Sequence, residues 1–386
     1  MNELLKNISD AAKERFPEIP FPHRKDEYWR FADLKAWNAD SLFPHFSNAV
    51  PQSKAEGKLL EIEKAANENG GISIFDGQLM SFIAPAGVAV MPMEKAAERY
   101  PQEVEKFYGK AVGKFDTLAA TRAQSGTAVV VESGANAELN LAVISKLGLS
   151  ISSTLFILGA DAKLRLVRSF AVNGESFGLN LTKFSLSKNS TLELATFKYS
   201  GDAAHSYLRD DFDVSENAKI VDAYAELGVS PSRAERNFEI LGADAEIDAR
   251  AFVKTCGKIT HDLRTSQMHR VGGSHSDLAV KCVADGESRL AFMGLVRVEE
   301  GAQKTRAYQS CRSLALSDFA KTQASPILEI MANDVECSHG CTVSKPNPEE
   351  VFYMNQRGLT TAAALGLITK SFAQTTFEKM GIEPEF

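Results

Sequence analysis

The sequence lacks the short motifs that mark most nucleotide-dependent and zinc-dependent enzymes. It contains no G-x-x-x-x-G-K-[ST] phosphate loop, no G-x-G-x-x-G dinucleotide loop and no H-E-x-x-H zinc helix. The phosphate loop supplies the backbone amides and the lysine that hold nucleotide phosphates. Its absence predicts that the chain does not hydrolyse ATP itself.

The chain also lacks a basic balance and long hydrophobic runs. Its net charge of −7 argues against nucleic acid as the main partner, because phosphate binding requires a basic face. No apolar run approaches the length of a membrane span, and the first residues lack the basic-then-apolar pattern of a signal peptide. We therefore expect a cytoplasmic protein whose five cysteines, an odd number, are reduced.

Strand-like patterns fill the middle of the chain, from about Thr127 to Leu316. Short apolar runs alternate there with polar turns. A turn motif recurs in which Asn or Asp is followed by a small, a polar and an aliphatic residue, at intervals of 25, 28, 28 and 27 residues. Its five copies are centred on Asn136, Asp161, Asn189, Asn217 and Asp244. A fixed period predicts a stacked solenoid, and strands without intervening helices favour a β-helix. A meander or sandwich is the alternative, although neither requires so even a period.

Helical patterns flank the strands on both sides. We expect an N-terminal helical or mixed region at 1–115, a β-helix core at 116–343 and a C-terminal helical domain at 344–386. Asn347 and Gly358 suit the start and stop of one C-terminal helix, and a second should run from about Thr360 to Met380. Because a solenoid has two open ends that must be covered, we expect these helical regions to cover them.

Two further segments have helical or aromatic patterns. Pro92 to Gly113 is predicted to be helical with a break at Pro101. The charged stretch from His23 to Phe31 contains Tyr28 and Trp29, and we interpret it as a segment that docks its rings on the main body.

Several residues outside these patterns are candidate sites. β-Helices often carry carbohydrate-active enzymes, which require paired carboxylates, and Asp210–Asp213 is the nearest candidate; the alternative is a solvated turn. His261 and His269 stand alone, and Gly272–Ser276 is interpreted as a turn. Core packing is expected for three cysteines in the repeats, Cys256, Cys282 and Cys311.

The densest chemistry is a row formed by Cys337, His339 and Cys341. In an extended strand alternate side chains share a face, so the row presents thiol, imidazole and thiol together, a soft-metal or redox surface. Alternate positions lie about 7 Å apart, whereas zinc requires ligands at about 2.0 to 2.3 Å. One strand therefore does not close a four-ligand cage. The row is either half of a site shared with another chain or loop, or buried packing.

The residues around this row resemble the SufB/SufD family of iron–sulfur cluster assembly proteins. The likeness runs from about Asp262 to the C-terminus, with Lys25–Leu34 similar to the family's N-terminal region. The segments that carry it are Ala307–Asp318, Ser325–Ile330, Asp334–Gly340, Glu349–Tyr353 and Gln356–Leu359. Gly340 stands where SufB-type chains typically have Glu, so the Cys-Ser-His-Gly form and the chain length match the SufD branch.

The resemblance implies a right-handed parallel β-helix between helical ends. It also implies a non-catalytic scaffold subunit of a SUF-type complex with a SufB-like chain and a SufC-like ATPase. His339, with Cys337 second and Cys341 third, would lie at the SufB interface, where iron or a nascent cluster binds transiently and no cofactor binds tightly. The C-terminal helices would contact the ATPase, through Phe352, Tyr353, Arg357 and Phe372. An exposed strand edge at this interface also predicts a homodimer in isolation.

Overall fold

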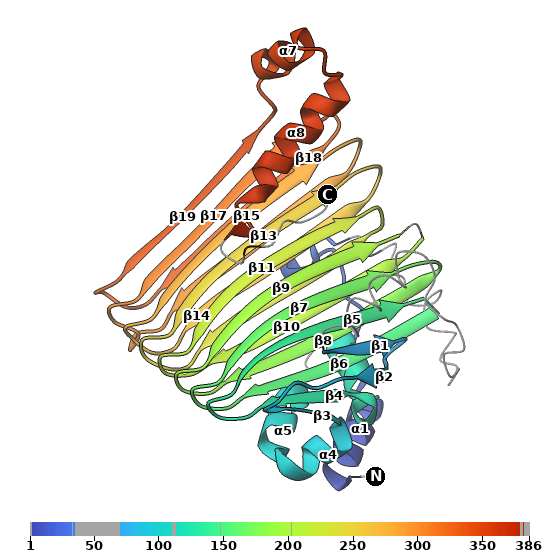
Figure 1. Ribbon diagram of the computed structural model, residues 1–386, viewed down its shortest axis with the longest axis vertical. Coiled ribbons are helices and arrows are strands. Elements are labelled where there is room, and N and C mark those ends of the chain that lie inside the picture. The colour runs from blue at the N-terminus through green and yellow to red at the C-terminus, as the bar shows by residue number, and fades with distance from the viewer. Residues whose placement is uncertain are drawn as a thin grey trace.

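A computed structural model describes residues 2–32, 34, 70–109, 113–146, 148–201, 203–378 and 381. The chain coils into a long solenoid whose successive strands alternate between two sheets (Figure 1). From β4 to β19, neighbouring strands within each sheet are parallel. The predicted mainly β architecture, a parallel β-helix flanked by helices, is confirmed. The hand of the coil stays a prediction.

The two sheets contain ten and nine strands and are named sheet A and sheet B below. Sheet A contains β1 (Gly71–Phe75), β2 (Gln78–Phe82), β5 (Asn136–Ser145), β7 (Lys163–Val172), β9 (Thr191–Ser200), β11 (Lys219–Gly228), β13 (Glu246–Thr255), β15 (His275–Ala284), β17 (Arg306–Ala315) and β19 (Glu336–Ser344). Sheet B contains β3 (Val88–Pro92), β4 (Thr127–Val131), β6 (Gly148–Leu158), β8 (Ser176–Leu186), β10 (His205–Val214), β12 (Ser232–Ile240), β14 (Thr260–His269), β16 (Arg289–Val298) and β18 (Lys321–Ile330).

The repeated Asn/Asp motif forms the turns that lead into sheet A. Asp161, Asn189, Asn217 and Asp244 all have positive φ angles of 54° to 59°, a conformation that Asn and Asp tolerate better than most residues. Their side chains also bond along the coil axis: Asn217 Nδ2 donates to Asn189 Oδ1 (2.8 Å). The first predicted copy is two residues out of register, because Asn136 pairs with Lys163 inside the sheet and Gly134 takes the turn position.

Identical side chains stack through the interior in the same way. Phe156, Phe184, Phe212 and Phe238 lie one per coil in sheet B, with ring centroids 4.9, 4.8 and 4.6 Å apart. All four are fully buried. Aromatic pairs at this spacing add stabilisation beyond their buried area. Each coil therefore packs mainly on the coils before and after it.

The acidic stretch Asp210–Asp213 lies inside strand β10, so the predicted solvated turn is wrong. Asp210 is fully buried and accepts hydrogen bonds from Arg168 Nη1 (2.9 Å) and Arg236 Nη1 (2.6 Å). Asp213 pairs with Lys183 at 2.5 Å. These carboxylates are paired with Arg and Lys side chains, so they do not form the exposed carboxylate pair that a carbohydrate-active enzyme requires.

The isolated histidines are buried and bonded within the core. His261 Nε2 lies 3.1 Å from the carbonyl oxygen of Ser230. His269 lies between the hydroxyls of Ser274 and Ser276, at 2.7 and 2.8 Å. The predicted turn at Gly272–Ser276 is confirmed over its first part, where Gly273 has a φ of +77°.

The N-terminal helices pack on the outer face of sheet B at the first coils (Figure 1). They are α1 (Glu3–Arg15), α4 (Met93–Arg99), α5 (Pro101–Gly109), α6 (Lys114–Ala120) and η2 (Ala123–Ser125), whereas the short helix η1 (Glu27–Trp29) packs further along sheet B, on β12 and β14. The predicted break at Pro101 is confirmed, since it separates α4 from α5. Before β4, strands β1 to β3 extend both sheets. Strand β2 pairs antiparallel with β1 in sheet A, and β3 pairs antiparallel with β4 in sheet B.

The C-terminal helices differ from the prediction in two respects, the end of the second helix and the surface that it covers. Asn347 caps α7 (Pro348–Gln356) and Gly358 follows it with a φ of +90°, as predicted. Helix α8 (Thr361–Gln374) ends before the predicted Met380, which lies outside the described residues. Instead of covering the end of the solenoid, α8 lies along the outer face of sheet A (Figure 1). An apolar stripe predicts that a helix face is buried, but not which surface buries it.

The last coil, β18 and β19, therefore forms an uncovered end among the described residues. Each of the two strands stands first in the order of its sheet. None of the described helices is long and apolar enough to span a membrane. The predicted division of the chain at residues 115 and 343 stays a prediction.

Candidate functional site at the uncovered end of the solenoid

Strand β19 places the thiol–imidazole–thiol row at a free edge of sheet A. Among the described strands it pairs with β17 alone, in register, so that Cys337, His339 and Cys341 stand opposite Ala307, Gln309 and Cys311. Those three partners are at most 3% exposed. The row thus continues an inward-facing line of side chains, at the point where no further coil covers it. Cys337 is half-buried, whereas His339 and Cys341 are exposed.

Exposed apolar side chains surround this end. Phe319 is 72% exposed and Val343 57% exposed, and Met331 is also exposed just after β18. A group of large apolar side chains at one end of a molecule is typical of an interaction surface. The row therefore lies beside a surface that suits a protein partner.

The structure places two further cysteines, Cys282 and Cys311, on the strands beside the row. The sequence had predicted only core packing for both. Cys311 is buried on β17 opposite Cys341, and Cys282 is buried on β15, the next strand of sheet A. Contact with the Cys282 thiol lowers the pKa of Cys311. The signal was the spacing of 29 and 30 residues between Cys282, Cys311 and Cys341, close to one coil. Cys256 follows β13 in a turn and is partly exposed, so it does not pack in the core as expected.

The two cysteines of the row itself, Cys337 and Cys341, do not readily ionise to thiolates. Partial burial, together with the neighbouring Cys311, raises the pKa of Cys341 to about 11. Partial burial also raises the pKa of Cys337. Metal binding by cysteine requires the thiolate, so both thiols start from the protonated form at neutral pH.

The row is not a complete metal site. Within the part of the chain that the structure describes, no three His, Cys, Asp or Glu side chains are arranged to hold a metal ion. The imidazole and the two thiols therefore supply part of a ligand set at most. The remaining ligands would have to come from a partner at the free edge.

Three of the four residues predicted to bind a partner lie together on or next to α7. The side chains of Phe352 and Tyr353 are 61% and 59% exposed. Arg357 Nη2 donates to the hydroxyl of Tyr353 at 3.0 Å, and its guanidinium lies 5.2 Å from that ring. Phe372 differs, because it packs on sheet A with its ring 4.9 Å from Lys281 Nζ.

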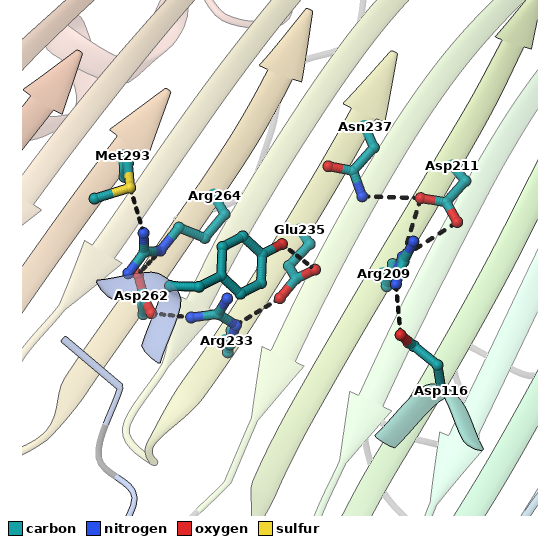
Figure 2. A network of polar contacts seen from close by, with 10 residues as sticks. Asp116, Arg209, Asp211, Arg233, Glu235, Asn237, Asp262, Arg264 and Met293 are labelled. Carbon is teal, nitrogen blue, oxygen red and sulfur yellow. Dashed lines mark hydrogen bonds and ion pairs between the residues drawn. The ribbon is translucent and has the colours of Figure 1, made fainter. Parts of the chain in front are cut away.

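A second polar cluster lies on the outer face of sheet B, beneath residues 23–32, which we name the N-terminal strap. Figure 2 shows Arg233, Glu235, Asp262 and Arg264 joined by hydrogen bonds and ion pairs across β12 and β14. Tyr28 donates its hydroxyl to Glu235 (2.7 Å), and the Arg233 guanidinium lies 3.9 Å from the Trp29 ring. The predicted docking of these rings on the main body is confirmed.

The charges of this cluster satisfy one another. Burial raises the pKa of Glu235, but the charges of Arg233 and Arg209 outweigh it and lower that pKa. Arg209 in turn bridges Asp116 (2.8 Å) and Asp211 (3.0 Å), as Figure 2 shows. With every carboxylate paired, the cluster fastens the strap to sheet B and offers no free acid or base.

Comparison with known proteins connects these features to one family. The model of the SUF system FeS cluster assembly SufBD core domain matches residues 139–372. The iron–sulfur cluster assembly protein SufD of Escherichia coli is 26% identical over 196 residues, which cover 51% of this chain and 46% of that protein. A SufBD family protein of Synechocystis is 23% identical over 96% of this chain and 86% of its own length. One from Pyrococcus horikoshii is 24% identical over 79% and 71%.

Proposed function

Because the chain belongs to the SufBD family of SUF-system iron–sulfur cluster assembly proteins, we propose that it is a scaffold subunit of the SufD type. In this role it pairs with a SufB-like chain and docks a SufC-like ATPase. The observation that carries the proposal is the placement of Cys337, His339 and Cys341 on a free strand edge at the uncovered end of the solenoid.

The pairing surface is the last coil. Strands β18 and β19 each leave one edge open in the described structure, and an extended segment of another chain adds readily to such an edge. The exposed Phe319, Met331 and Val343 provide apolar area beside it. A long uncovered edge is an aggregation hazard unless a partner occupies it, which supports an obligate partner there.

His339 is the side chain of the row best suited to bind iron. It is exposed at the edge, and a neutral imidazole is a ligand for iron without losing a proton first. Cys337 ranks second, and the raised pKa of Cys341 ranks it third. Iron and sulfide are the cargo of this site, and the partner chain would supply the thiolates.

The docking surface for the ATPase is α7. The chain has no phosphate loop, so the energy of ATP hydrolysis must come from another subunit. Helix α7 begins at Pro348, soon after β19 ends at Ser344, and it exposes Phe352 and Tyr353. Movement of α7 would therefore reach β19 and the pairing surface through a very short connection.

The role of His339 is tested in the complex purified with both partners. The variant His339→Ala should assemble normally but lose most of its cluster formation, measured by visible absorption and bound iron. Ser338→Ala is the matched control, because Ser338 is exposed on the same strand but outside the row. Cluster formation by His339→Ala equal to that of Ser338→Ala would show that the imidazole has no such role.

Docking on α7 is tested by co-purification with the SufC-like ATPase. The double variant Phe352→Ala/Tyr353→Ala should lose the ATPase while it retains the SufB-like chain. Leu367→Ala, an exposed apolar residue on α8, is the control and should retain both partners. Retention of the ATPase by the double variant would contradict the assignment of α7 as the docking surface.

A further inference from the structure

A basic pocket lies away from the uncovered edge of sheet A, between the N-terminal strap and the outer face of sheet B. Its volume is about 590 Å³, and it is lined by the strap and by the first residues of β14, β16 and β18. Small-molecule sites typically have volumes of roughly 300–1,000 Å³. The pocket is therefore large enough to hold a ligand of nucleotide size.

The lining of this pocket is strongly positive. It contains one carboxylate, Glu287, against five cations, which are Arg24, Arg30, Lys258, Arg289 and Lys321. Glu287 already pairs with Lys258 at 3.1 Å. No ion pair involves any of the other four cations within the described part of the chain. Four uncompensated positive charges thus face one cavity, in a protein whose net charge is −7.

Two of these cations are direct register partners. Arg289 on β16 stands opposite Lys321 on β18, and adjacent strands lie about 4.8 Å apart. Like charges placed opposite each other are destabilising. Other register partners on the solenoid surface carry opposite signs, such as Arg165 with Glu193 (3.0 Å) and Lys219 with Glu246 (2.9 Å).

Other like-charge register pairs have a compensating group. Lys281 stands opposite Arg312, but its ammonium donates to the carbonyl of Phe372 (2.6 Å) at the negative end of α8. Asp248 stands opposite Asp277, and Arg250 bridges both at 2.9 and 2.7 Å. Arg289 and Lys321 have no such group among the described residues. An anion in the pocket would supply it.

We propose that this pocket binds a free, multiply charged phosphate ester of nucleotide size. Guanidinium groups match phosphate oxygens in paired hydrogen bonds, and Arg24, Arg30 and Arg289 provide three of them. The half-buried ring of Phe31 and the side chain of Ile259 line the same cavity and provide an apolar wall for the organic part. The site includes Lys321 on β18, whose open edge belongs to the proposed pairing surface, but it contains no residue of β19. It therefore does not depend on the role proposed for the row on β19.

The probe is ADP, titrated into the full-length chain at low ionic strength and followed by calorimetry. ADP should bind one site per chain and should be displaced by inorganic pyrophosphate, since both present adjacent phosphates. The double variant Arg289→Gln/Lys321→Gln should bind ADP with an affinity roughly tenfold lower or more, because hydrogen bonds to charged groups are among the strongest. Both residues are exposed at strand starts, so the variant should fold normally, as circular dichroism will show.

The control is the double variant Arg306→Gln/Lys163→Gln. It removes the same charge from exposed first residues of two sheet A strands. It should bind ADP as the unmodified chain does. Three results would overturn the proposal: no ADP binding, equal binding by the pocket variant and the unmodified chain, or equal losses in the two variants. The last result would reduce the effect to overall charge.

Discussion

Replacing Asp210 with alanine removes the carboxylate that joins two buried arginines. Its Oδ2 lies 2.5 Å from Arg168 Nη2 and 2.6 Å from Arg236 Nη1. Among the described residues, the other hydrogen bonds of the Arg168 guanidinium go to two hydroxyls, those of Thr196 (2.8 Å) and Thr182 (3.1 Å), and not to a carboxylate. Arg236 keeps Asp222 at 2.6 Å. The substitution therefore leaves one buried guanidinium, that of Arg168, without a directly bonded carboxylate.

The size of the effect follows from that geometry. Removing one partner of a buried ion pair costs about 3–5 kcal/mol, because a charge stays in a low-dielectric environment. Two hydroxyls still bond Arg168, so we expect the lower end, about 3 kcal/mol of unfolding free energy. Glu216→Ala is the matched control. It breaks an ion pair with Lys188 of similar length, 2.7 Å, but both side chains are more than half exposed, so it should cost below about 1 kcal/mol.

The assay is urea unfolding followed by far-ultraviolet circular dichroism, with the midpoints of the two variants compared. The companion variant Asp210→Ala/Arg168→Met should recover much of the loss, because it removes the stranded charge as well. The reasoning is refuted if Asp210→Ala is no less stable than Glu216→Ala. It is also refuted if the companion variant is less stable than Asp210→Ala.

Three further predictions concern titrating groups. Burial raises the pKa of Glu226, but the charge and hydrogen bond of Lys198, together with His261 and Ser232, outweigh burial and lower that pKa from 4.5 to about 2. The contribution of Glu226 to stability is therefore lost as pH falls from 4.5 towards 2, and the urea midpoints of the unmodified chain and Glu226→Gln should converge over that range. Burial lowers the pKa of His269 from 6.5 to about 4. As pH drops from 6.5 to 4, the unfolded chain protonates this histidine before the folded chain does, so stability falls. The variant His269→Gln should show a smaller loss of urea midpoint over that range. Because the pKa of Cys341 is about 11, iodoacetamide should modify it slowly at pH 8 and faster at pH 10, measured by mass spectrometry, whereas buried Cys282 should stay unmodified in the native chain.

The turn chemistry made the solenoid predictable. Asn and Asp recur where the backbone needs a positive φ, and the same residues bond to their counterparts on the next coil. The turn conformation and the hydrogen bonds between coils therefore favour the same residue types, Asn and Asp, at the same positions. Asn136 misled the prediction because a residue of the right type stands two positions from the turn that Gly134 forms.

The buried charges were not predictable in the same way. The partners of Asp210 are 42 and 26 residues away in the sequence, one in each sheet, and nothing nearby shows that its strand faces inward there. The row at β19 was predictable because period-two alternation is local. Its continuation through Cys311 and Cys282 required the register between strands, which only the coil length could have suggested. Likewise, the stripe of α8 did not reveal that sheet A buries it.

The near-constant register between coils has a consequence for how such chains change in length. From β4 to β19, register partners are 26 to 32 residues apart, and the side chains of each strand lie over those of the next. Deleting or duplicating one whole coil would keep every stack of phenylalanine and asparagine in line and shift the two ends by one strand spacing, about 4.8 Å. A single-residue insertion within a strand would turn the following side chains to the opposite face. We therefore expect lengths of related solenoids to vary by whole coils or within turns.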